Sequence, residues 1–391
     1  MTAGIVCEYN PLHNGHLFHI EKTKAAGADH IVCVMSGNFV QRGECACIDK
    51  WSRAKAAVEC GADVVVDLPV PWAMASAESF ARGSISLLSR FNIDFLSFGC
   101  ETENKELLMK CACHSENEEM SSLLKAYMSQ GMNYPSALTK AVEEKLGSEA
   151  AEIITSPNST LAVEYVRQMK KYLPDCAILP IKRMGAEHDS DEQQEGFASA
   201  SGIRKLIGKK DVSGLMPSAM YNILSLQFKS GKAPCRTELA ERAILSCLRG
   251  MNKDELSLYV TDKTGLADRI YNSVRTAESL EELYDNTKSK NYTHSRVRRE
   301  IMNAYLGIEN NIHLSEPPFV RVLAVSGKGL ALLKNVKDVP MITKHSDACR
   351  LDSFAERVYE IQCSTTDKFA LMSPNICPCG MEQKNSMVIV R

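Results

Sequence analysis

Two stretches of the chain share one pattern, in which Gly-Ala-Asp follows a segment with helical spacing and precedes a run of mostly β-branched residues. They are "GADHIVCVMSG", which starts at Gly27, and "GADVVVDLP", which starts at Gly61. Glycine is common at helix ends, and a short continuous apolar run is typical of a parallel strand buried on both faces. The pattern therefore predicts, twice in succession, a helix that ends and leads into a buried parallel strand.

Other segments extend this arrangement. Three more short apolar runs are predicted as strands, namely Ala3–Cys7, Ile93–Phe98 and Ala177–Ile181. Segments with helical spacing lie between the strands, namely Leu17–Ala26, Lys50–Cys60 with Asp49 as its N-cap, Ser76–Phe91 and Leu161–Tyr172. The alternation of strands and helices predicts an α/β fold with a Rossmann-like, doubly wound parallel sheet.

The length of the chain favours two domains, because 391 residues exceed the roughly 250–300 residues at which single hydrophobic cores stop growing. The α/β pattern ends after Ile207, where "GKKDVSG" forms a polar, glycine-containing joint. We therefore predict a nucleotide-binding α/β domain over residues 1–210 and a mainly α-helical C-terminal domain, with a mixed final part, over residues 211–391. Residues 103–145 are predicted as an all-helical insertion.

The overall charge limits the classes of partner. A net charge of −2 and a pI near 6.5 argue against a globally basic nucleic-acid coat, but they leave room for one local basic face. The 15 cysteines, in a chain that opens with Met1-Thr2-Ala3 and no signal peptide, are expected as reduced thiols in the cytoplasm. No run approaches the roughly 20 apolar residues that span a bilayer, so a soluble protein is expected.

The stretch "CEYNPLHNGHLFHIEK", residues 7–22, lies where the first predicted strand gives way to a helix. In an open parallel sheet, ligands bind at the carboxyl ends of strands, where helix N-termini present unpaired N–H groups. Gly15 lets the backbone approach a phosphate, while His13 and His16 can point to the same side and donate hydrogen bonds to phosphate oxygens. Such histidines can also simply cap a helix, so the motif alone leaves the transferred group open.

A second element, "SASGIR", places Ser199 and Ser201 ahead of a short helix that carries Arg204. Serines at a helix start can act as caps, but with an arginine they can also hold the distal phosphates of a triphosphate. Combined with the histidines, this element indicates cleavage of ATP between its α and β phosphates.

The two elements together resemble the HIGH-motif nucleotidylyltransferase superfamily, in which a histidine pair stabilises the transition state at the α-phosphate and a Ser/Thr-x-x-Arg element grips the pyrophosphate. More narrowly, five ordered motifs are similar to those of the tRNA(Met) cytidine acetate ligase family. They are "GIVCEYNPLHNGH", "VMSGNFVQRGE", "FGCE", "SPNSTLAVEY" and "SASGIR". The resemblance covers about the first 205 residues and continues more weakly beyond them.

The resemblance implies an ATP-dependent ligase that forms a carbon–nitrogen bond. Acetate would attack the α-phosphate of ATP to give acetyl-adenylate and pyrophosphate. The N4 amine of the wobble cytidine of elongator tRNA(Met) would then take the acetyl group, giving N4-acetylcytidine. No covalent enzyme intermediate is required, so catalysis would rest on positioning and electrostatics, with Mg²⁺ on the phosphates and no metal site of the protein's own.

The family resemblance also assigns site residues. Catalysis falls to His13 and His16. ATP binding falls to Val6, Cys7, Glu8, Tyr9, Asn10, Pro11, His13, Asn14, Gly15, His16, His19, Gly99, Asn158, Arg183, Ser199, Ser201 and Arg204. Without the family, Gly99 is equally a turn glycine, Asn158 an N-cap, and His19 a core or solvent-facing residue. Gln41 and Arg42, in the polar loop of residues 36–44, are further candidates for shaping the acetate pocket.

A tRNA substrate calls for Lys and Arg against phosphates and for aromatic side chains against splayed bases. Residues 288–300 offer both, and we predict tRNA binding by Lys288, Lys290, Tyr292, Arg296, Arg298 and Arg299. A second basic stretch, "RKLIGKK", covers residues 204–210. Charge runs are also typical of an ordinary solvated surface.

Two other functions stay open. A nucleotidylyltransferase that adenylates a small phosphorylated cofactor precursor would share the histidines and the Ser-x-x-Arg element, but it would leave the second half of the chain without a role. A non-catalytic RNA-binding protein would not need both histidines and Arg204. "NICPCG", Cys349 and Cys363 lack the paired spacing of structural zinc sites, so ordinary thiols are expected there. The sequence does not predict an oligomeric state.

Overall fold

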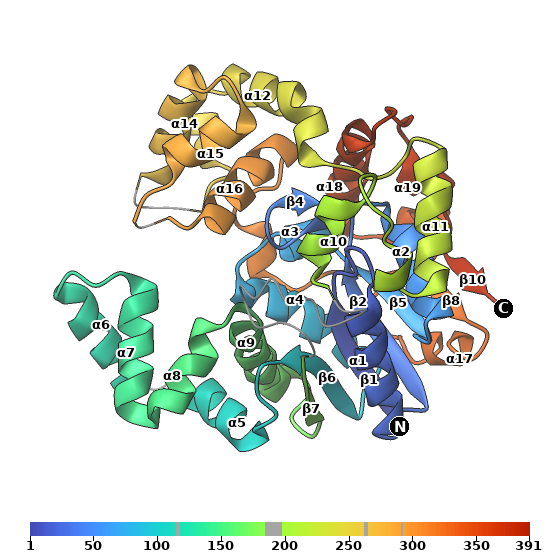
Figure 1. Ribbon diagram of the computed structural model, residues 1–391, viewed down its shortest axis with the longest axis horizontal. Coiled ribbons are helices and arrows are strands. Elements are labelled where there is room, and N and C mark those ends of the chain that lie inside the picture. Colours follow the sequence, from blue (N-terminus) through green and yellow to red (C-terminus); the bar gives the residue numbers. More distant parts are fainter. Residues whose placement is uncertain (115–117, 184–197, 262–264, 291) are drawn as a thin grey trace.

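An open sheet organises the molecule (Figure 1). The computed structural model describes residues 1–114, 118–183, 198–261, 265–290 and 292–391. Within these ranges eight strands form the sheet in the order β10-β8-β5-β2-β1-β6-β7, with β9 paired to β8. The strands are β1 (Thr2–Cys7), β2 (His30–Ser36), β5 (Val64–Leu68), β6 (Phe95–Cys100), β7 (Ala177–Lys182), β8 (Val320–Ser326), β9 (Met341–Ile342) and β10 (Val388–Val390).

The parallel centre of the sheet consists of the five strands that the sequence predicts. The chain runs outward from β1 through β2 to β5, then crosses back to β6 and β7, with every neighbouring pair parallel. This reversal between β1 and β6 opens a crevice at the carboxyl ends of the strands. The predicted α/β, doubly wound fold is confirmed. One strand is displaced from its prediction, since β6 begins at Phe95 and not at Ile93.

Helices join and cover the strands. In the first half they are α1 (Asn14–Ala25), α2 (Lys50–Glu59), α3 (Val70–Ala73), α4 (Ala77–Ser89), α5 (Lys105–His114), α6 (Glu118–Ser129), α7 (Tyr134–Leu146), α8 (Ser148–Thr155) and α9 (Pro157–Tyr172). Asp49 caps α2 as predicted, and Ser76 caps α4. A short hairpin of β3 (Phe39–Val40) and β4 (Glu44–Cys45) lies in the segment after β2 that the sequence predicts as a polar loop.

The second half contributes further helices. They are α10 (Ala200–Leu206), α11 (Ser218–Lys229), α12 (Glu241–Gly250), α13 (Lys253–Ser257), α14 (Leu266–Thr276), α15 (Leu280–Thr287), α16 (His294–Leu306), α17 (Leu330–Leu333), α18 (Ser353–Phe369) and α19 (Met381–Lys384). None of the helices in the described ranges is both long and apolar enough to cross a membrane.

Alternate residues of the central strands face two separate cores. On β2, Val32 and Val34 pack in the core that includes α4 and α9, whereas Ile31, Cys33 and Met35 pack in the core that includes α1, α2 and α11. Side chains alternate across a strand, so a sheet covered on both faces needs apolar residues at every position. This explains why the strand runs are apolar without alternation.

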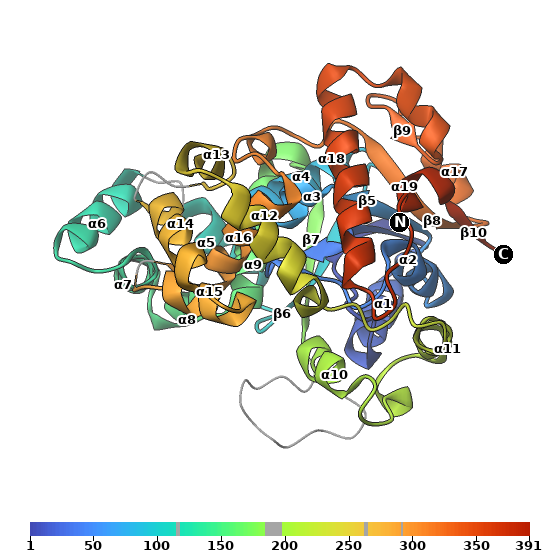
Figure 2. The same cartoon turned by 90° about the horizontal axis from the view of Figure 1, so that it is seen from above.

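Two helical units extend beyond the sheet. The insertion formed by α5 to α8 makes an arm at one end of the molecule, and α12 to α16 form a lobe beside it (Figure 1). Ile244, Leu283 and Ile301 of the lobe pack in an apolar core that also includes Phe39 of β3 and Phe369 of α18. The C-terminal elements α17, α19 and β10 lie at the opposite end from the arm (Figure 2).

The last part of the chain returns to the sheet. β8 pairs with β5 in antiparallel orientation, and β9 and β10 flank β8. The boundary near residue 210 stays a prediction, but residues 211–391 are not one helical unit, because their end completes the sheet of the first half. The apolar run of β8 is the signal in the sequence for this arrangement.

A network of buried charges joins the C-terminal segment to the sheet. The Lys50 ammonium donates to Asp67 Oδ2 at 2.6 Å and to Glu382, and the side chains of all three are at most 1% exposed. The Arg321 guanidinium lies 3.5 Å from Glu382 Oε2. Lys50 begins α2 and Glu382 lies in α19, so the network joins the first part of the sheet domain to a helix near the C-terminus.

Candidate active site

The segment between β1 and α1 forms the floor of the crevice. Tyr9 adopts φ = 44°, in the left-handed region that residues other than glycine rarely occupy, and its side chain is buried. The fully buried Arg53 donates hydrogen bonds to the carbonyl oxygens of Glu8 at 2.6 Å and Ser36 at 3.0 Å, and also to that of Gly37. One guanidinium therefore fixes the segments that follow both β1 and β2.

The two predicted catalytic histidines form a stacked pair at the start of α1. Their ring centroids lie 3.8 Å apart with the planes inclined by 25°. His13 is the N-cap, and its Nδ1 accepts the Gly15 N–H at 3.1 Å, while His16 Nδ1 accepts the His13 N–H at 3.3 Å. In a neutral imidazole the nitrogen that accepts carries no proton, so both rings hold their proton on Nε2. Each ring therefore carries one uncharged N–H donor, and in the ligand-free protein the His16 ring also hydrogen-bonds the Pro11 backbone.

Gly15 has a specific reason to be glycine. A Cβ at this position would meet Cε1 of His13 at 3.0 Å and Nδ1 at 3.1 Å. The glycine predicted to admit a phosphate thus also gives the His13 ring room to fold over the first turn of the helix.

His19 lies one turn further along and faces β6. Its Nε2 is 2.9 Å from the Ser97 hydroxyl, which in turn is 2.7 Å from the Thr23 hydroxyl. The sequence alone did not show whether His19 faces the core or the solvent. In the structure it lies inside the protein and links α1 to β6.

Burial keeps the three histidines uncharged. Burial, followed by repulsion from the Arg183 guanidinium, lowers the pKa of His13 and of His19 from 6.5 to about 4. The pKa of His16 is lowered well below its usual value by burial and then by His13 and Arg183. In the ligand-free protein we expect no titration of the ring signals of His13 and His19 in NMR spectra between about pH 5 and pH 8, the usual range for histidine. A step near pH 6.5 for either ring would contradict this.

The same shifts make stability depend on pH. Between pH 6.5 and about 4 the unfolded chain binds protons at His13 and His19 that the folded protein does not bind. Stability contributed by these groups is therefore present above pH 6.5 and is lost as the pH falls towards 4. We expect His19→Gln to have a flatter decline of the unfolding free energy over this interval than the unmodified protein, measured by urea denaturation. An equally steep decline in both proteins would contradict the lowered pKa of His19.

A second group of predicted residues lies at the ends of β6 and β7. Asn158, at the start of α9, donates to Glu101 Oε1 at 2.8 Å and accepts from Arg183 NH1 at 3.3 Å. A Cβ on Gly99 would lie in ordinary contact, 3.5 Å from Cγ of Arg183. Burial opposes ionisation of Glu101, but hydrogen bonds from Ser159 and Asn158 lower its pKa overall. The carboxylate therefore orients Asn158, and Asn158 orients Arg183 beside the histidines.

The "SASGIR" element reaches the same crevice through its arginine. Arg204 NH1 donates to the carbonyl oxygen of Asn10 at 2.9 Å, which places the guanidinium against the turn that leads to the histidines. Ser199 is the N-cap of α10 and accepts the Gly202 N–H at 3.1 Å. Ser201 is half-buried in the first turn. The capping interpretation of Ser199 is thus correct in this structure, and Arg204 is the member of the element that contacts the histidine segment.

The remaining ATP candidates line or support the turn. Val6 and Cys7 end β1, and Pro11 is buried. Asn10 accepts the Cys47 N–H at 2.8 Å, and Asn14 donates to the Gly214 carbonyl oxygen at 2.9 Å. Both amides therefore hold the turn to neighbouring segments.

The loop after β2 contacts the histidine segment. The Glu8 carboxylate accepts the Gln41 N–H at 3.0 Å. Burial raises the pKa of Glu8, while the Gln41 hydrogen bond and the charges of Arg204 and Arg42 oppose that rise. The backbone of Gln41, and the charge of Arg42, thus act on a glutamate of the histidine segment.

The predicted RNA-binding residues separate into groups. Lys288 and Lys290 are exposed. Arg296 donates to the Thr261 carbonyl oxygen at 3.0 Å and lies over the Tyr292 ring. Tyr292 is only 7% exposed and belongs to an apolar core of the lobe, so its ring is not presented for stacking on a base, and its assignment to tRNA binding stays a prediction.

The other two arginines face the crevice. Arg298 NH1 pairs with Glu44 Oε1 at 2.6 Å, and Arg299 NH1 donates to the Gln41 carbonyl oxygen at 3.3 Å. These side chains join the lobe to the loop beside the histidine segment.

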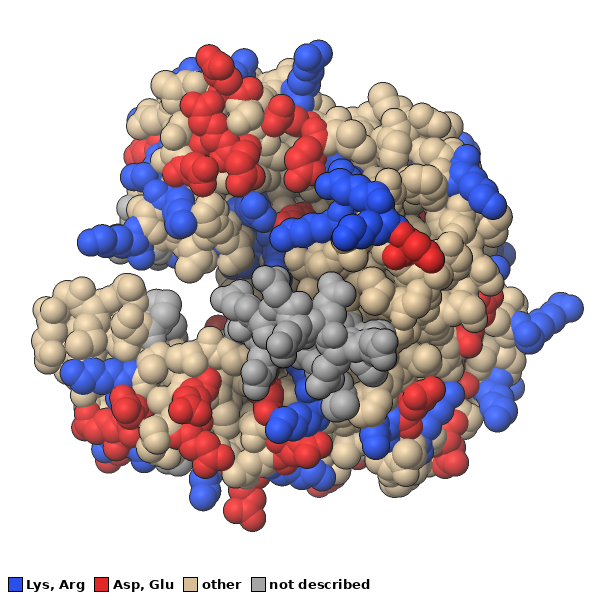
Figure 3. All heavy atoms as spheres, viewed as in Figure 1, with Lys and Arg blue, Asp and Glu red and all other residues tan. Residues whose placement is uncertain are grey.

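The surface around this region is hollowed. Figure 3 shows a recess between the α5–α8 arm and the α12–α16 lobe, with Lys and Arg side chains gathered over α10. Exposed Lys205, Lys209 and Lys210 of the second basic stretch lie in and just after α10. Positive charge is thus present next to the arginine of the "SASGIR" element.

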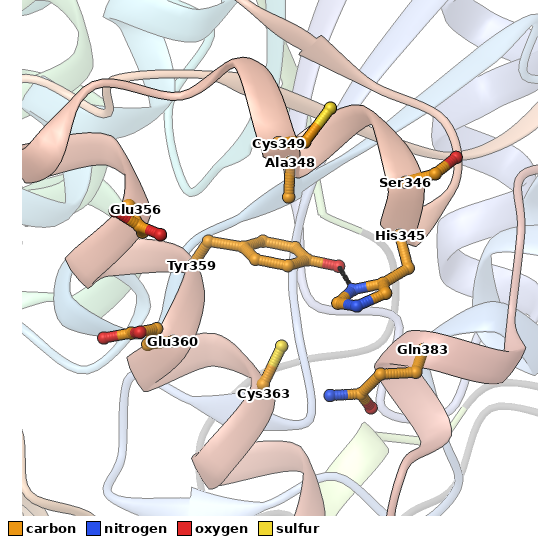
Figure 4. Close-up of a pocket in the computed structure, with 9 residues that line it drawn as sticks. All are labelled: His345, Ser346, Ala348, Cys349, Glu356, Tyr359, Glu360, Cys363 and Gln383. Carbon is orange, nitrogen blue, oxygen red and sulfur yellow. Dashed lines mark hydrogen bonds between the residues drawn. The ribbon is translucent and has the colours of Figure 1, made fainter.

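A separate hollow of about 430 Å³ lies at the other end of the molecule, beside α18 (Figure 4). It is lined by His345, Cys349, Tyr359 and Cys363 among others, with His345 Nδ1 3.1 Å from the Tyr359 hydroxyl. Across the described residues, no group of three or more His, Cys, Asp or Glu side chains is arranged to hold a metal ion. This hollow contains none of the residues that the sequence assigns to ATP.

Sequence reasoning missed several residues of the site. Arg53, Ser97 and Glu44 position the crevice segments but were not singled out. Arg53 could have been noticed as a charge amid the small apolar residues of α2. Ser97 and Glu44 give no comparable signal, because their partners lie 78 and 254 residues away in the sequence.

Comparisons with known proteins agree with this geometry. The family model described as HIGH Nucleotidyl Transferase matches residues 1–384. The doubly wound sheet and the paired histidines at its crevice are the features expected of a nucleotidyl transferase of the HIGH class.

Curated relatives narrow the family. A protein of Acetivibrio thermocellus named tRNA(Met) cytidine acetate ligase is 32% identical, with 100% of both chains covered. One of the same name from Caldanaerobacter subterraneus is 36% identical, with 96% of both chains covered. The chain belongs to the tRNA(Met) cytidine acetate ligase family. The crystal structure of Thermotoga maritima TmcAL bound with alpha-thio ATP matches at a TM-score of 0.91, with 26% identity and 100% of both chains covered.

Proposed function

We propose that this protein is an ATP-dependent tRNA(Met) cytidine acetate ligase that acts in the cytoplasm. The observation that carries the proposal is the stacked pair of neutral histidines at the start of α1, in a chain whose full length matches ligases of that name. Oriented N–H donors suit a phosphate whose negative charge grows during displacement, because their hydrogen bonds strengthen as that charge develops.

The reaction proceeds in two balanced steps. A carboxylate oxygen of acetate bonds to the α-phosphorus of ATP, and the bond from that phosphorus to the bridging oxygen breaks, so pyrophosphate leaves. The N4 amine of the wobble cytidine then bonds to the acetyl carbon, AMP leaves and the nitrogen loses a proton. His13 and His16 donate to the α-phosphate oxygens, while Arg204 and Arg183 hold charged oxygens on either side.

Mg²⁺ fits this arrangement as a partner of the triphosphate. Magnesium is commonly bound by substrate phosphates and one or two carboxylates, and not by an all-protein cage. The described residues contain no three-ligand group of their own. When bound, the ion would neutralise charge on the phosphates, with Glu8 as the carboxylate nearest to the histidine turn in sequence.

The decisive experiment is incubation of the protein with labelled acetate, ATP, Mg²⁺ and bulk tRNA. Label in tRNA, released as N4-acetylcytidine on digestion, supports the ligase. Adenylation of a small phosphorylated cofactor precursor without labelling of tRNA would point instead to the alternative transferase. Binding of tRNA without any turnover of ATP would indicate a non-catalytic RNA-binding protein.

The exposed lysines provide a test of RNA binding. Replacing Lys288 and Lys290 by alanine is expected to weaken tRNA binding and to reduce the slope of log affinity against log salt by up to about two phosphate contacts. Filter binding at several salt concentrations measures both quantities. The same replacement of Lys334 and Lys337, beyond the lobe, serves as the control. An unchanged slope would remove Lys288 and Lys290 from the RNA-binding surface.

A further inference from the structure

Glu44 lies between two arginines that come from different helices, Arg204 of α10 and Arg298 of α16. Its Oε1 accepts from Arg298 NH1 at 2.6 Å, and its Oε2 is 3.6 Å from Arg204 NH2. The shorter pair is a direct charge-assisted hydrogen bond, whereas the longer one is an ion pair without hydrogen-bond geometry. The Glu44 carboxylate therefore interacts more strongly with Arg298 of the lobe than with Arg204.

The backbone fixes this arrangement. Gly43 has φ = 76°, and a Cβ there would meet the backbone nitrogen of Arg299 at 2.6 Å and the carbonyl carbon of Arg298 at 2.7 Å. The β3–β4 hairpin therefore lies directly against α16. Arg298 is further held over the Tyr284 ring at 5.2 Å from its centroid, so the arginine that engages Glu44 is itself oriented.

The negative charge of Glu44 makes it a competitor of phosphate for the Arg204 guanidinium. A phosphate and a carboxylate compete for the same guanidinium N–H groups. With Arg298 in place, Glu44 is occupied and Arg204 keeps its hydrogen bond to the Asn10 carbonyl oxygen. If Arg298 were absent, the Glu44 carboxylate would pair with Arg204 and cancel its charge.

We propose that Arg298 is a positioning residue that acts through Glu44: it holds the Glu44 carboxylate towards the lobe, so that the Arg204 guanidinium stays available to the distal phosphates of ATP. The inference rests on the proposed function in one respect, namely that Arg204 binds those phosphates. It goes beyond that function by giving an arginine of the helical lobe a role in nucleotide affinity.

Binding of a non-hydrolysable ATP analogue, measured by calorimetry with Mg²⁺ and without tRNA, tests the idea. Arg298→Ala is expected to weaken binding about tenfold, the scale of one charge-assisted pair. Glu44→Gln should bind no more weakly than the unmodified protein. The double variant should bind like Glu44→Gln, because no carboxylate remains to compete. Arg357→Ala, which removes a surface pair with Glu309, is the matched control and should leave binding unchanged.

The double variant separates this role from a purely structural one. If Arg298 served only to hold the lobe in place, removing Glu44 as well would not restore affinity. A double variant as weak as Arg298→Ala, or an Arg298→Ala protein with unchanged affinity, would overturn the proposal. Failure of the ligase proposal would show separately, as absence of acetate-dependent exchange of pyrophosphate into ATP by a protein that still binds the analogue. A protein that binds no ATP analogue would overturn both.

Discussion

Replacing either His13 or His16 by alanine is expected to reduce acetyl transfer at least about 10²-fold, the effect of losing one transition-state hydrogen-bond donor. Each ring accepts a backbone N–H on Nδ1 and therefore carries its proton on Nε2, so each variant removes one N–H donor. The loss should fall mainly on kcat, because the donors act on charge that develops during displacement. Acetate-dependent exchange of labelled pyrophosphate into ATP measures the first step without tRNA.

Matched variants make this result interpretable. Glutamine places an amide N–H near the position of Nε2, so His13→Gln and His16→Gln should retain more activity than the alanine variants. His345→Ala changes a histidine in the hollow beside α18 and should leave the exchange rate unaltered. Near-normal turnover by both alanine variants would show that the histidines only cap the helix.

The buried charge network is expected to give the largest effect on stability. Glu382→Ala leaves the Lys50 ammonium, 1% exposed, with Asp67 alone and deprives Arg321 of its carboxylate partner. Removing one member of a buried ion pair typically costs about 3–5 kcal/mol, because a charge is left buried without compensation. Urea denaturation should show a correspondingly lower midpoint with an unchanged slope.

A surface pair supplies the control. Glu309 pairs with Arg357, and both side chains are about half exposed. Exposed pairs contribute about 0–1 kcal/mol, so Glu309→Ala should barely change the midpoint. Equal effects of the two substitutions would mean that the Lys50 network contributes no more than an ordinary surface contact.

Much of the parallel sheet follows from local sequence. Each of its five central strands is an apolar run that the structure places at or within two residues of its predicted start. Such runs are distinctive because both faces of the sheet are covered, as the separate environments of Val32 and Cys33 illustrate. The position of the histidines at the first strand–helix junction follows directly from this pattern.

The contacts that shape the crevice were not predictable in the same way. Arg53 reaches carbonyl oxygens on two loops, and Glu44 meets Arg298 across 254 residues of sequence. No spacing rule links positions so far apart, and a charged residue in a helix is normally expected to face solvent. The burial of Tyr292 was not predictable either, because it depends on packing between helices of the lobe that are distant in sequence.

The return of the C-terminus to the sheet has a consequence for how the protein is made. Lys50, whose backbone N–H donates to the Asn38 side chain in the loop beside the crevice, is partnered by Glu382, which lies 332 residues later. A ribosome that has synthesised every residue assigned to ATP has therefore supplied Asp67 but not Glu382, the second carboxylate partner of this buried charge. The nascent chain cannot complete this network until residue 382 has been synthesised, so termination before Glu382 should yield protein that is degraded and not merely less active.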